Sequence, residues 1–140
     1  MYDYFSTKLQ QIKKNYYSKK NKNKNIEKDV KDLINELLDF NIEICNLLVK
    51  VQKETNIKTF KDLSLFIFKY CLSPFVKDNK NIFQKNIINK KINSLLKKFY
   101  NYFLLFAFYI DNISQHHFIK SDEKLEDYLK GFKALKKSLR

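Results

Sequence analysis

Apolar residues recur every three to four positions along most of this chain, which is the spacing of helices that bury one face. The pattern is clearest over residues 27–54, where two neighbouring rows of apolar side chains form a stripe wider than a coiled-coil seam. Similar patterns predict helices over residues 2–16, 59–73 and 82–118, and from Ser121 onward. We therefore expect an all-α fold, a single-domain bundle of four to five helices with a basic N-terminal arm.

One segment interrupts the helical pattern near the start of the chain. Residues 18–25, SKKNKNKN, contain no apolar side chain, which is typical of a flexible loop or a solvated arm. This break divides the chain into two expected parts. They are a short helix with a basic flexible arm over residues 1–25, and a helical bundle domain over residues 26–140.

Several residues mark where the predicted helices begin, end or pack closely. Thr59 and Asp62 have the spacing of a capping box and are expected to open the third helix, which Pro74 is expected to end. Ser121 is expected to be the N-cap of the last helix. Gly131 lies inside that helix, where glycine costs about 1 kcal/mol relative to alanine, so it indicates close packing against a neighbour.

Composition narrows the functions that remain open. A single glycine excludes the glycine-built phosphate cradles of nucleotide-binding proteins. The net charge is +13, from 27 lysines and one arginine against 15 carboxylates. Codons rich in A and T encode most of the abundant residue types, and such a bias inflates lysine. It does not explain why the lysines are clustered along the chain.

The sequence also indicates where the protein works. Cys45 and Cys71 lie in apolar helical stretches without a C-x-x-C spacing, so we expect two buried, unpaired thiols and a reducing intracellular compartment, cytoplasmic or organellar. The first 25 residues lack the apolar core of a secretory signal. The longest uncharged apolar run, Phe99–Ile110, would span about 18 Å as a helix against a hydrocarbon core of about 30 Å, so no transmembrane span is expected.

Catalytic and metal-binding residues are sparse. His116 and His117 are the only histidines, and adjacent helical side chains point about 100° apart, so both do not easily face one metal ion. No H-E-x-x-H or E-x-x-H spacing occurs. We therefore expect a non-enzymatic protein with no catalytic residue, metal site, cofactor or small-molecule substrate.

Lysines gather in two segments that aromatic residues flank. Positive side chains neutralise phosphates, and exposed rings stack on unpaired bases. Tyr16, Tyr17 and Tyr100 are expected to be exposed, whereas Phe99 and Phe103 are expected in the core. The candidate nucleic-acid-binding residues are Lys13, Lys14, Lys19, Lys20, Lys22, Lys24, Lys85, Lys90, Lys91, Lys97 and Lys98.

An acidic stripe accompanies the predicted helix over residues 27–54. Its members step by three and four positions and so share one helix face: Asp29, Asp32, Glu36, Asp39 and Glu43. The stripe is either a solvated flank or a partner-binding edge for lysines. Lys90 and Lys97, or Lys91 and Lys98, are expected to supply those lysines, within the chain or between subunits.

These observations predict a basic helical subunit or accessory factor of a ribonucleoprotein or other nucleic-acid-containing assembly, with RNA as the expected polyanion. Two alternatives stay open. One is a protein–protein interaction module, either a structural subunit of a larger complex or an effector. The other is a peripheral protein on an anionic membrane surface.

Overall fold

The computed structural model describes residues 2–20, 26–73, 90–115 and 124–139. The elements in these ranges are α1 (Tyr2–Lys20), α2 (Ile26–Glu54), α3 (Ile57–Ile67), the π-helical segment η1 (Phe68–Leu72), α6 (Lys90–Gln115) and α7 (Leu125–Ser138). No strand occurs in the described ranges, which confirms the all-α prediction.

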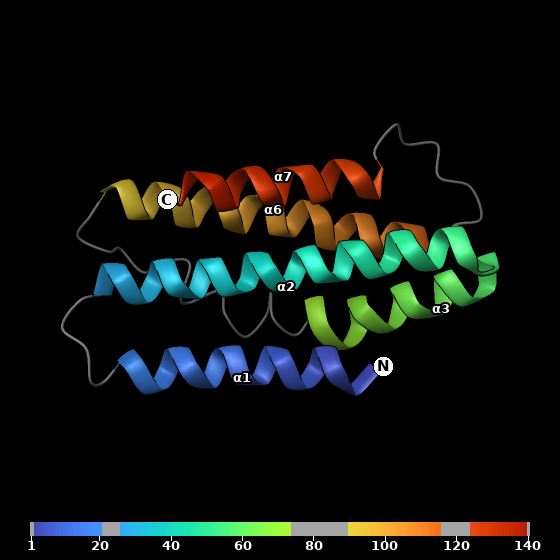
Figure 1. The fold of residues 1–140 in the computed structure, drawn as a ribbon, viewed down its shortest axis with the longest axis horizontal. Coiled ribbons are helices and arrows are strands. Elements are labelled where there is room, and N and C mark those ends of the chain that lie inside the picture. Colours follow the sequence, from blue (N-terminus) through green and yellow to red (C-terminus); the bar gives the residue numbers. More distant parts are fainter. Residues whose placement is uncertain (1, 21–25, 74–89, 116–123, 140) are drawn as a thin grey trace.

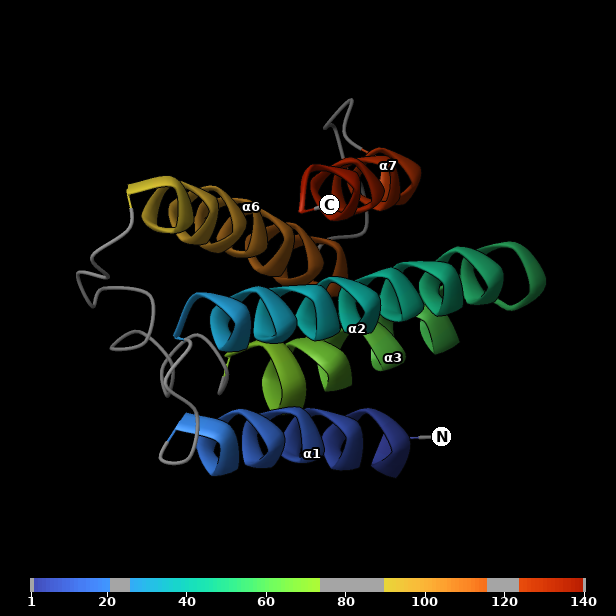
Figure 2. The same cartoon turned by 60° about the vertical axis from the view of Figure 1, so that its left-hand side comes forward.

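Helix α2 runs through the middle of the molecule and contacts every other α-helix (Figure 1). Helices α1 and α3 lie on one side of it and α6 and α7 on the other, while α3 also packs along α6 (Figure 2). Helix α1 is antiparallel to α2, and α7 is antiparallel to α6. The start of α6 and the end of α7 therefore lie at the same end of the molecule.

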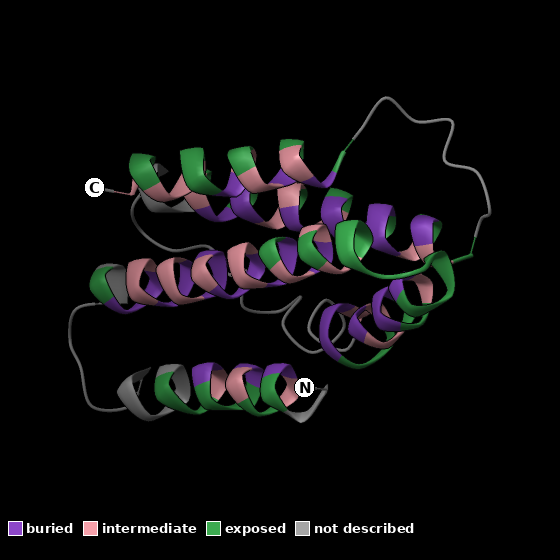
Figure 3. Ribbon diagram, turned by 45° about the vertical axis from the view of Figure 1, so that its right-hand side comes forward, coloured by how far each residue is buried: buried purple, intermediate pink, exposed green. Residues whose placement is uncertain are grey.

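The core forms where the predicted apolar stripes meet. Leu37, Ile44 and Leu48 of α2 have no exposed surface, as the stripe over residues 27–54 predicts. Each such burial contributes about 1.5–3 kcal/mol relative to an exposed side chain. Figure 3 shows buried residues along the inward faces of all the helices and exposed residues along the outward faces. The inward face of α1, with Phe5 and Leu9, belongs to this same core.

Aromatic rings join α6 to α7. Phe106 meets Phe132 edge to face at a centroid distance of 5.1 Å, and Tyr102 meets Phe132 in the same way at 5.0 Å. Such pairs contribute about 0.5–1.5 kcal/mol beyond the area that they bury. The Tyr102 hydroxyl donates to the carbonyl oxygen of Asp127 at 3.3 Å, directly above Gly131, which confirms the close packing predicted for that glycine.

Two helix starts differ from their predictions. Helix α3 begins at Ile57, because Asn56 is the N-cap and its Oδ1 accepts a hydrogen bond from the Thr59 backbone N–H at 2.8 Å. Helix α7 begins at Leu125 after an extended Lys124, whose backbone N–H donates to the Asp127 carboxylate at 3.2 Å. The expected caps at residues 59 and 121 were therefore wrong.

The remaining boundaries fall partly outside the described residues. Helix α1 continues through Lys20, so residues 18–20 of the expected loop are helical, and residues 21–25 lie outside the description. The chain stays helical through Ser73, and Pro74 lies outside the description. The helix predicted over residues 82–118 is described as α6, Lys90–Gln115.

Candidate nucleic-acid interface

The described parts of the lysine segments predicted from the sequence lie at one end of the molecule, on the left in Figure 1. We call this the basic end and define it as residues 13–20 of α1, 26–32 of α2, 90–98 of α6 and 133–138 of α7. Its positive residues are Lys13, Lys14, Lys19, Lys20, Lys28, Lys31, Lys90, Lys91, Lys97, Lys98, Lys133, Lys136 and Lys137. Its carboxylates are Glu27, Asp29 and Asp32.

The opposite end of the molecule carries no such excess among its described helical residues. Its lysines are Lys50, Lys53, Lys58 and Lys61, on α2 and α3. Its carboxylates are Asp3, Glu54, Asp62, Asp111, Glu126 and Asp127. The positive charge is therefore distributed unevenly along the long axis, although codon bias alone would spread lysine over both ends.

The described side chains at the basic end differ in exposure. Lys14, Lys97 and Lys98 are exposed, and Lys13 is half-buried. Of the other candidate lysines, four lie on described helices without a described side chain, and three lie outside the described residues. The first four are Lys19, Lys20, Lys90 and Lys91, and the last three are Lys22, Lys24 and Lys85.

Sequence reasoning missed the contribution of α7 to this end. Lys133 and Lys137 are exposed on its last two turns, where lysines also offset the helix dipole. These lysines reach the basic end because α7 is antiparallel to α6. The sequence pattern of a single helix does not reveal this direction. Two helix starts and two helix ends meet at the basic end, so their dipoles largely offset each other and the lysines dominate the potential.

The acidic stripe of α2 faces lysines of its own chain. Lys136 of α7 pairs with Asp39, and Lys8 of α1 pairs with Glu43. Asp39 and Glu43 therefore pair with lysines of α7 and α1, and the pairing of the other stripe members with lysines of α6 stays a prediction. The other members of the stripe are Asp29, which is buried, and Asp32 and Glu36, which are half-buried.

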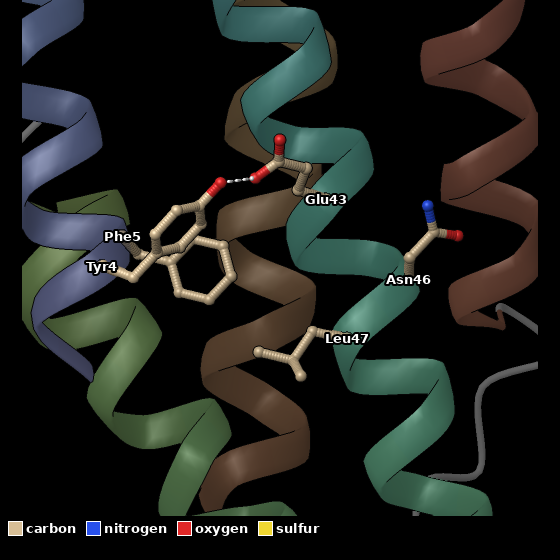
Figure 4. A pocket seen from close by; sticks show the side chains of 5 residues that line it. All are labelled: Tyr4, Phe5, Glu43, Asn46 and Leu47. Atoms are coloured by element: carbon tan, nitrogen blue, oxygen red, sulfur yellow. Dashed lines mark hydrogen bonds between the residues drawn. The ribbon is translucent and has the colours of Figure 1, made fainter. Parts of the chain in front are cut away.

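The pair on α1 is part of a small cluster that holds α1 against α2. The Tyr4 hydroxyl donates to the Glu43 carboxylate at 2.9 Å, and Lys8 donates to its other oxygen. Figure 4 shows Tyr4 pointing at Glu43 beside a pocket of about 360 Å³ that Phe5 and Leu47 also line. Burial lowers the pKa of Lys8, but the hydrogen bond and the charge of Glu43 outweigh it and raise that pKa.

The aromatic residues give little support to base stacking. Phe99 and Phe103 are buried, as predicted. Tyr100 is half-buried and packs against the core, so the expectation that its ring is exposed was wrong. Tyr16 and Tyr17 lie on α1 without a described side chain. The candidate interface therefore rests on charge.

The remaining chemical features are the two cysteines and the residue types that could hold a metal ion. Cys45 and Cys71 are unpaired and buried, as predicted, and burial raises their pKa values to about 12 and about 11. Such thiols stay protonated near neutral pH. Among described residues, no three His, Cys, Asp or Glu side chains are placed to hold a metal ion, and His116 and His117 lie outside that part.

Comparisons with known proteins give no relative for this chain: no family model, curated protein or solved structure matches it. In the described parts of the chain, no helix has the length and apolar character needed to cross a bilayer.

Proposed function

We propose that the chain is a non-enzymatic basic helical protein that binds RNA through the basic end, as an accessory factor or subunit of a ribonucleoprotein assembly. The observation that carries this proposal is the meeting of lysines from four helices at one end, with thirteen lysines, of which Lys136 pairs with the neighbouring Asp39, against three carboxylates. The proposal keeps the chain as one domain with a basic N-terminal arm, acting inside a reducing compartment.

The spacing of these charges supports cooperative action on one ligand. Exposed charges act together over about one Debye length, roughly 8 Å at physiological ionic strength. Lys97 and Lys98 lie about two turns after the start of α6, and Lys98 lines the same groove as Leu135 and Ser138 from the last turn of α7. A chain of phosphates across this end would meet several lysines at once and release the corresponding counterions.

A charge-neutralisation experiment tests the proposal. The affinity of the full chain for a fluorescein-labelled single-stranded RNA of about 20 nucleotides is measured by anisotropy over a range of salt concentrations. The triple variant Lys14→Gln, Lys97→Gln, Lys98→Gln removes three exposed charges from the basic end. If each lysine contacts one phosphate, the slope of log affinity against log salt falls by about 2.

The matched control removes the same charge from the other end, with Lys50→Gln, Lys53→Gln and Lys58→Gln, all exposed. We expect this control to keep the native salt slope. Equal losses in both variants would mean that net charge alone attracts RNA, and would overturn the assignment to the basic end. Unchanged heparin elution after neutralising Lys19, Lys20, Lys22 and Lys24 would remove the arm from the interface.

A protein–protein module is the second candidate, with Asp29, Asp32, Glu36, Asp39 and Glu43 as its partner-binding edge. Two of these carboxylates already pair with Lys8 and Lys136, which lowers their availability to a partner. Nuclease treatment of the native complex separates the two functions. If the nuclease-treated complex keeps all its protein partners and its size, the protein–protein module is favoured. A separate experiment tests the membrane alternative: cosedimentation of the chain with anionic vesicles but not with neutral ones would favour a membrane surface.

A further inference from the structure

A groove of about 550 Å³ runs between α6 and α7. On α6 it is lined by Lys98, Asn101 and Leu105, and on α7 by Gly131, Ala134 and Leu135. Its α7 wall has small side chains at Gly131, Ala134 and Ser138, and the Tyr102 ring of α6 lies over Gly131. The lining is mainly apolar, although the groove overlaps the basic end, to which Lys98, Ala134 and Leu135 belong.

Large apolar side chains stand exposed along the α6 wall. Leu105 is 57% exposed, and Phe108, three positions later on the same helix face, is 61% exposed. Single exposed apolar residues are ordinary on protein surfaces. Leu105 lines the apolar groove and Phe108 lies three positions beyond it on the same helix face, and exposed apolar residues grouped in this way are typical of a protein-binding surface.

Lysines border this patch. Lys98 lies in the groove itself, two turns before Leu105. Lys130 and Lys137 are exposed on α7 and share a helix face with Ala134, which they flank at four and three positions. The groove thus combines an apolar floor with positive borders. Its lining on α6 runs from residue 98 to residue 105, which is about 10 Å or two helical turns.

We propose that this groove binds an acidic amphipathic helix of a partner protein. Apolar side chains at positions i, i+3 or i+4, and i+7 of that helix would cover Leu105, Ala134 and Phe108, while its flanking carboxylates face Lys98, Lys130 and Lys137. A polynucleotide would satisfy the lysines but leave Leu105 uncovered. The charge complementarity and the apolar floor therefore select an acidic peptide, a ligand that RNA binding does not require, although Lys98 and Lys137 belong to both surfaces.

A displayed peptide library tests the proposal on the full chain. The library consists of helical peptides of about 18 residues, with Leu, Phe or Ser along one stripe and Glu, Gln or Lys at the flanks. We expect selection to enrich apolar stripes with glutamate flanks. Enrichment of lysine or glutamine flanks, or no enrichment at all, overturns the proposal.

Variants then locate the binding site of the best enriched peptide, resynthesised with a fluorescent label. Leu105→Ser and Ala134→Glu change exposed groove residues and are expected to weaken binding about tenfold or more. The control Leu65→Ser makes the same change at a leucine on α3 that is 44% exposed, and is expected to leave the affinity unchanged. Equal effects of Leu105→Ser and Leu65→Ser would overturn the site.

Two other occupants are outcomes of the same experiment. If light scattering shows that the native chain dimerises and that Leu105→Ser is monomeric, a second copy covers the groove and the proposal is wrong. If Leu105→Ser lowers the affinity for the labelled RNA as much as the affinity for the peptide, the groove is a nucleic-acid-binding surface and the proposal is also wrong. Retained RNA affinity in Leu105→Ser, with loss of the peptide, supports it.

Discussion

Gly131 lies where only a hydrogen atom fits against the ring of Tyr102. A Cβ atom added at Gly131 would come within 1.8 Å of the Tyr102 hydroxyl oxygen and 2.3 Å of the ring carbon that bears it. The hydroxyl is held above the glycine by its hydrogen bond to the Asp127 carbonyl oxygen. This contact is one of several between α6 and α7, and both residues line the groove between these helices.

Gly131→Ala is expected to destabilise the protein. Alanine gains about 1 kcal/mol of helix propensity over glycine, but the Tyr102 ring must leave its place, and overpacking of this kind costs typically about 1–3 kcal/mol. We expect a net loss in the free energy of unfolding, measured by urea denaturation. In a Tyr102→Ala background the same substitution should become stabilising. A stabilising effect of Gly131→Ala in the native background would contradict the contact.

Asn41→Leu is expected to stabilise the protein. Asn41 has no exposed surface, and its Nδ2 donates to the Leu37 carbonyl oxygen at 2.7 Å, while its Oδ1 has no partner among the described residues. A buried acceptor without a partner costs about 1–3 kcal/mol, which leucine removes. Urea denaturation should show a higher midpoint.

Ser64 provides the control for this prediction. It is equally buried, but its hydroxyl donates to the Phe60 carbonyl oxygen at 2.8 Å, so Ser64→Ala removes a satisfied group. We expect Ser64→Ala to leave stability unchanged or lower it. If Asn41→Leu lowers the midpoint as well, the amide has a partner that gives it a stabilising role.

Lys8 is expected to contribute stability that disappears at high pH. Its folded-state pKa is raised above the ordinary 10.5 by Glu43, which outweighs the effect of burial. The contribution is therefore fully present below the unfolded-state pKa and is lost as pH rises through the folded-state pKa. The free energies of unfolding of the native chain and Lys8→Met should differ by at most about 1 kcal/mol near neutral pH and converge above the folded-state pKa. A gap that widens with pH would contradict the pairing.

The two thiols are expected to be unreactive in the folded protein. Burial raises the pKa of Cys45 to about 12 and that of Cys71 to about 11, so little thiolate exists at about pH 8. A thiol-specific chromogenic disulfide reagent should therefore label neither residue in the native chain and both residues in denaturant. Rapid labelling of either one without denaturant would show that its helix opens readily.

The sequence predicts where helices form and which face is buried better than it predicts which other helices pack against them. The periodicity of residues 27–54 identifies the buried face of α2, because one helix determines which of its own residues share a face. Helix caps are harder: Asn56 and Thr59 are both good N-caps, and the one that forms the cap depends on the turn that precedes the helix. Ser121 outranks Lys124 as a cap, yet α7 begins after Lys124.

The candidate interface depends on how the helices are arranged relative to one another. The periodicity of apolar residues within each helix carries no information about that arrangement. The partners of Asp39 and Glu43 come from α7 and α1 because those helices flank α2, a placement that no spacing within one helix reveals. For the same reason the sequence identifies the lysines of α7 as residues at a helix end but does not identify them as part of the basic end. The lysine segments themselves are visible in the sequence, but their common location requires the directions of four helices.

Among the described residues, the concentration of lysine at one end forms an electric dipole along the long axis of the molecule. In the field of any large negative body the molecule experiences a torque as well as an attraction, so it turns before it touches. The molecule then meets a negative partner predominantly with its basic end. Added salt screens this long-range orienting effect at lower concentrations than it screens the ion pairs formed at contact.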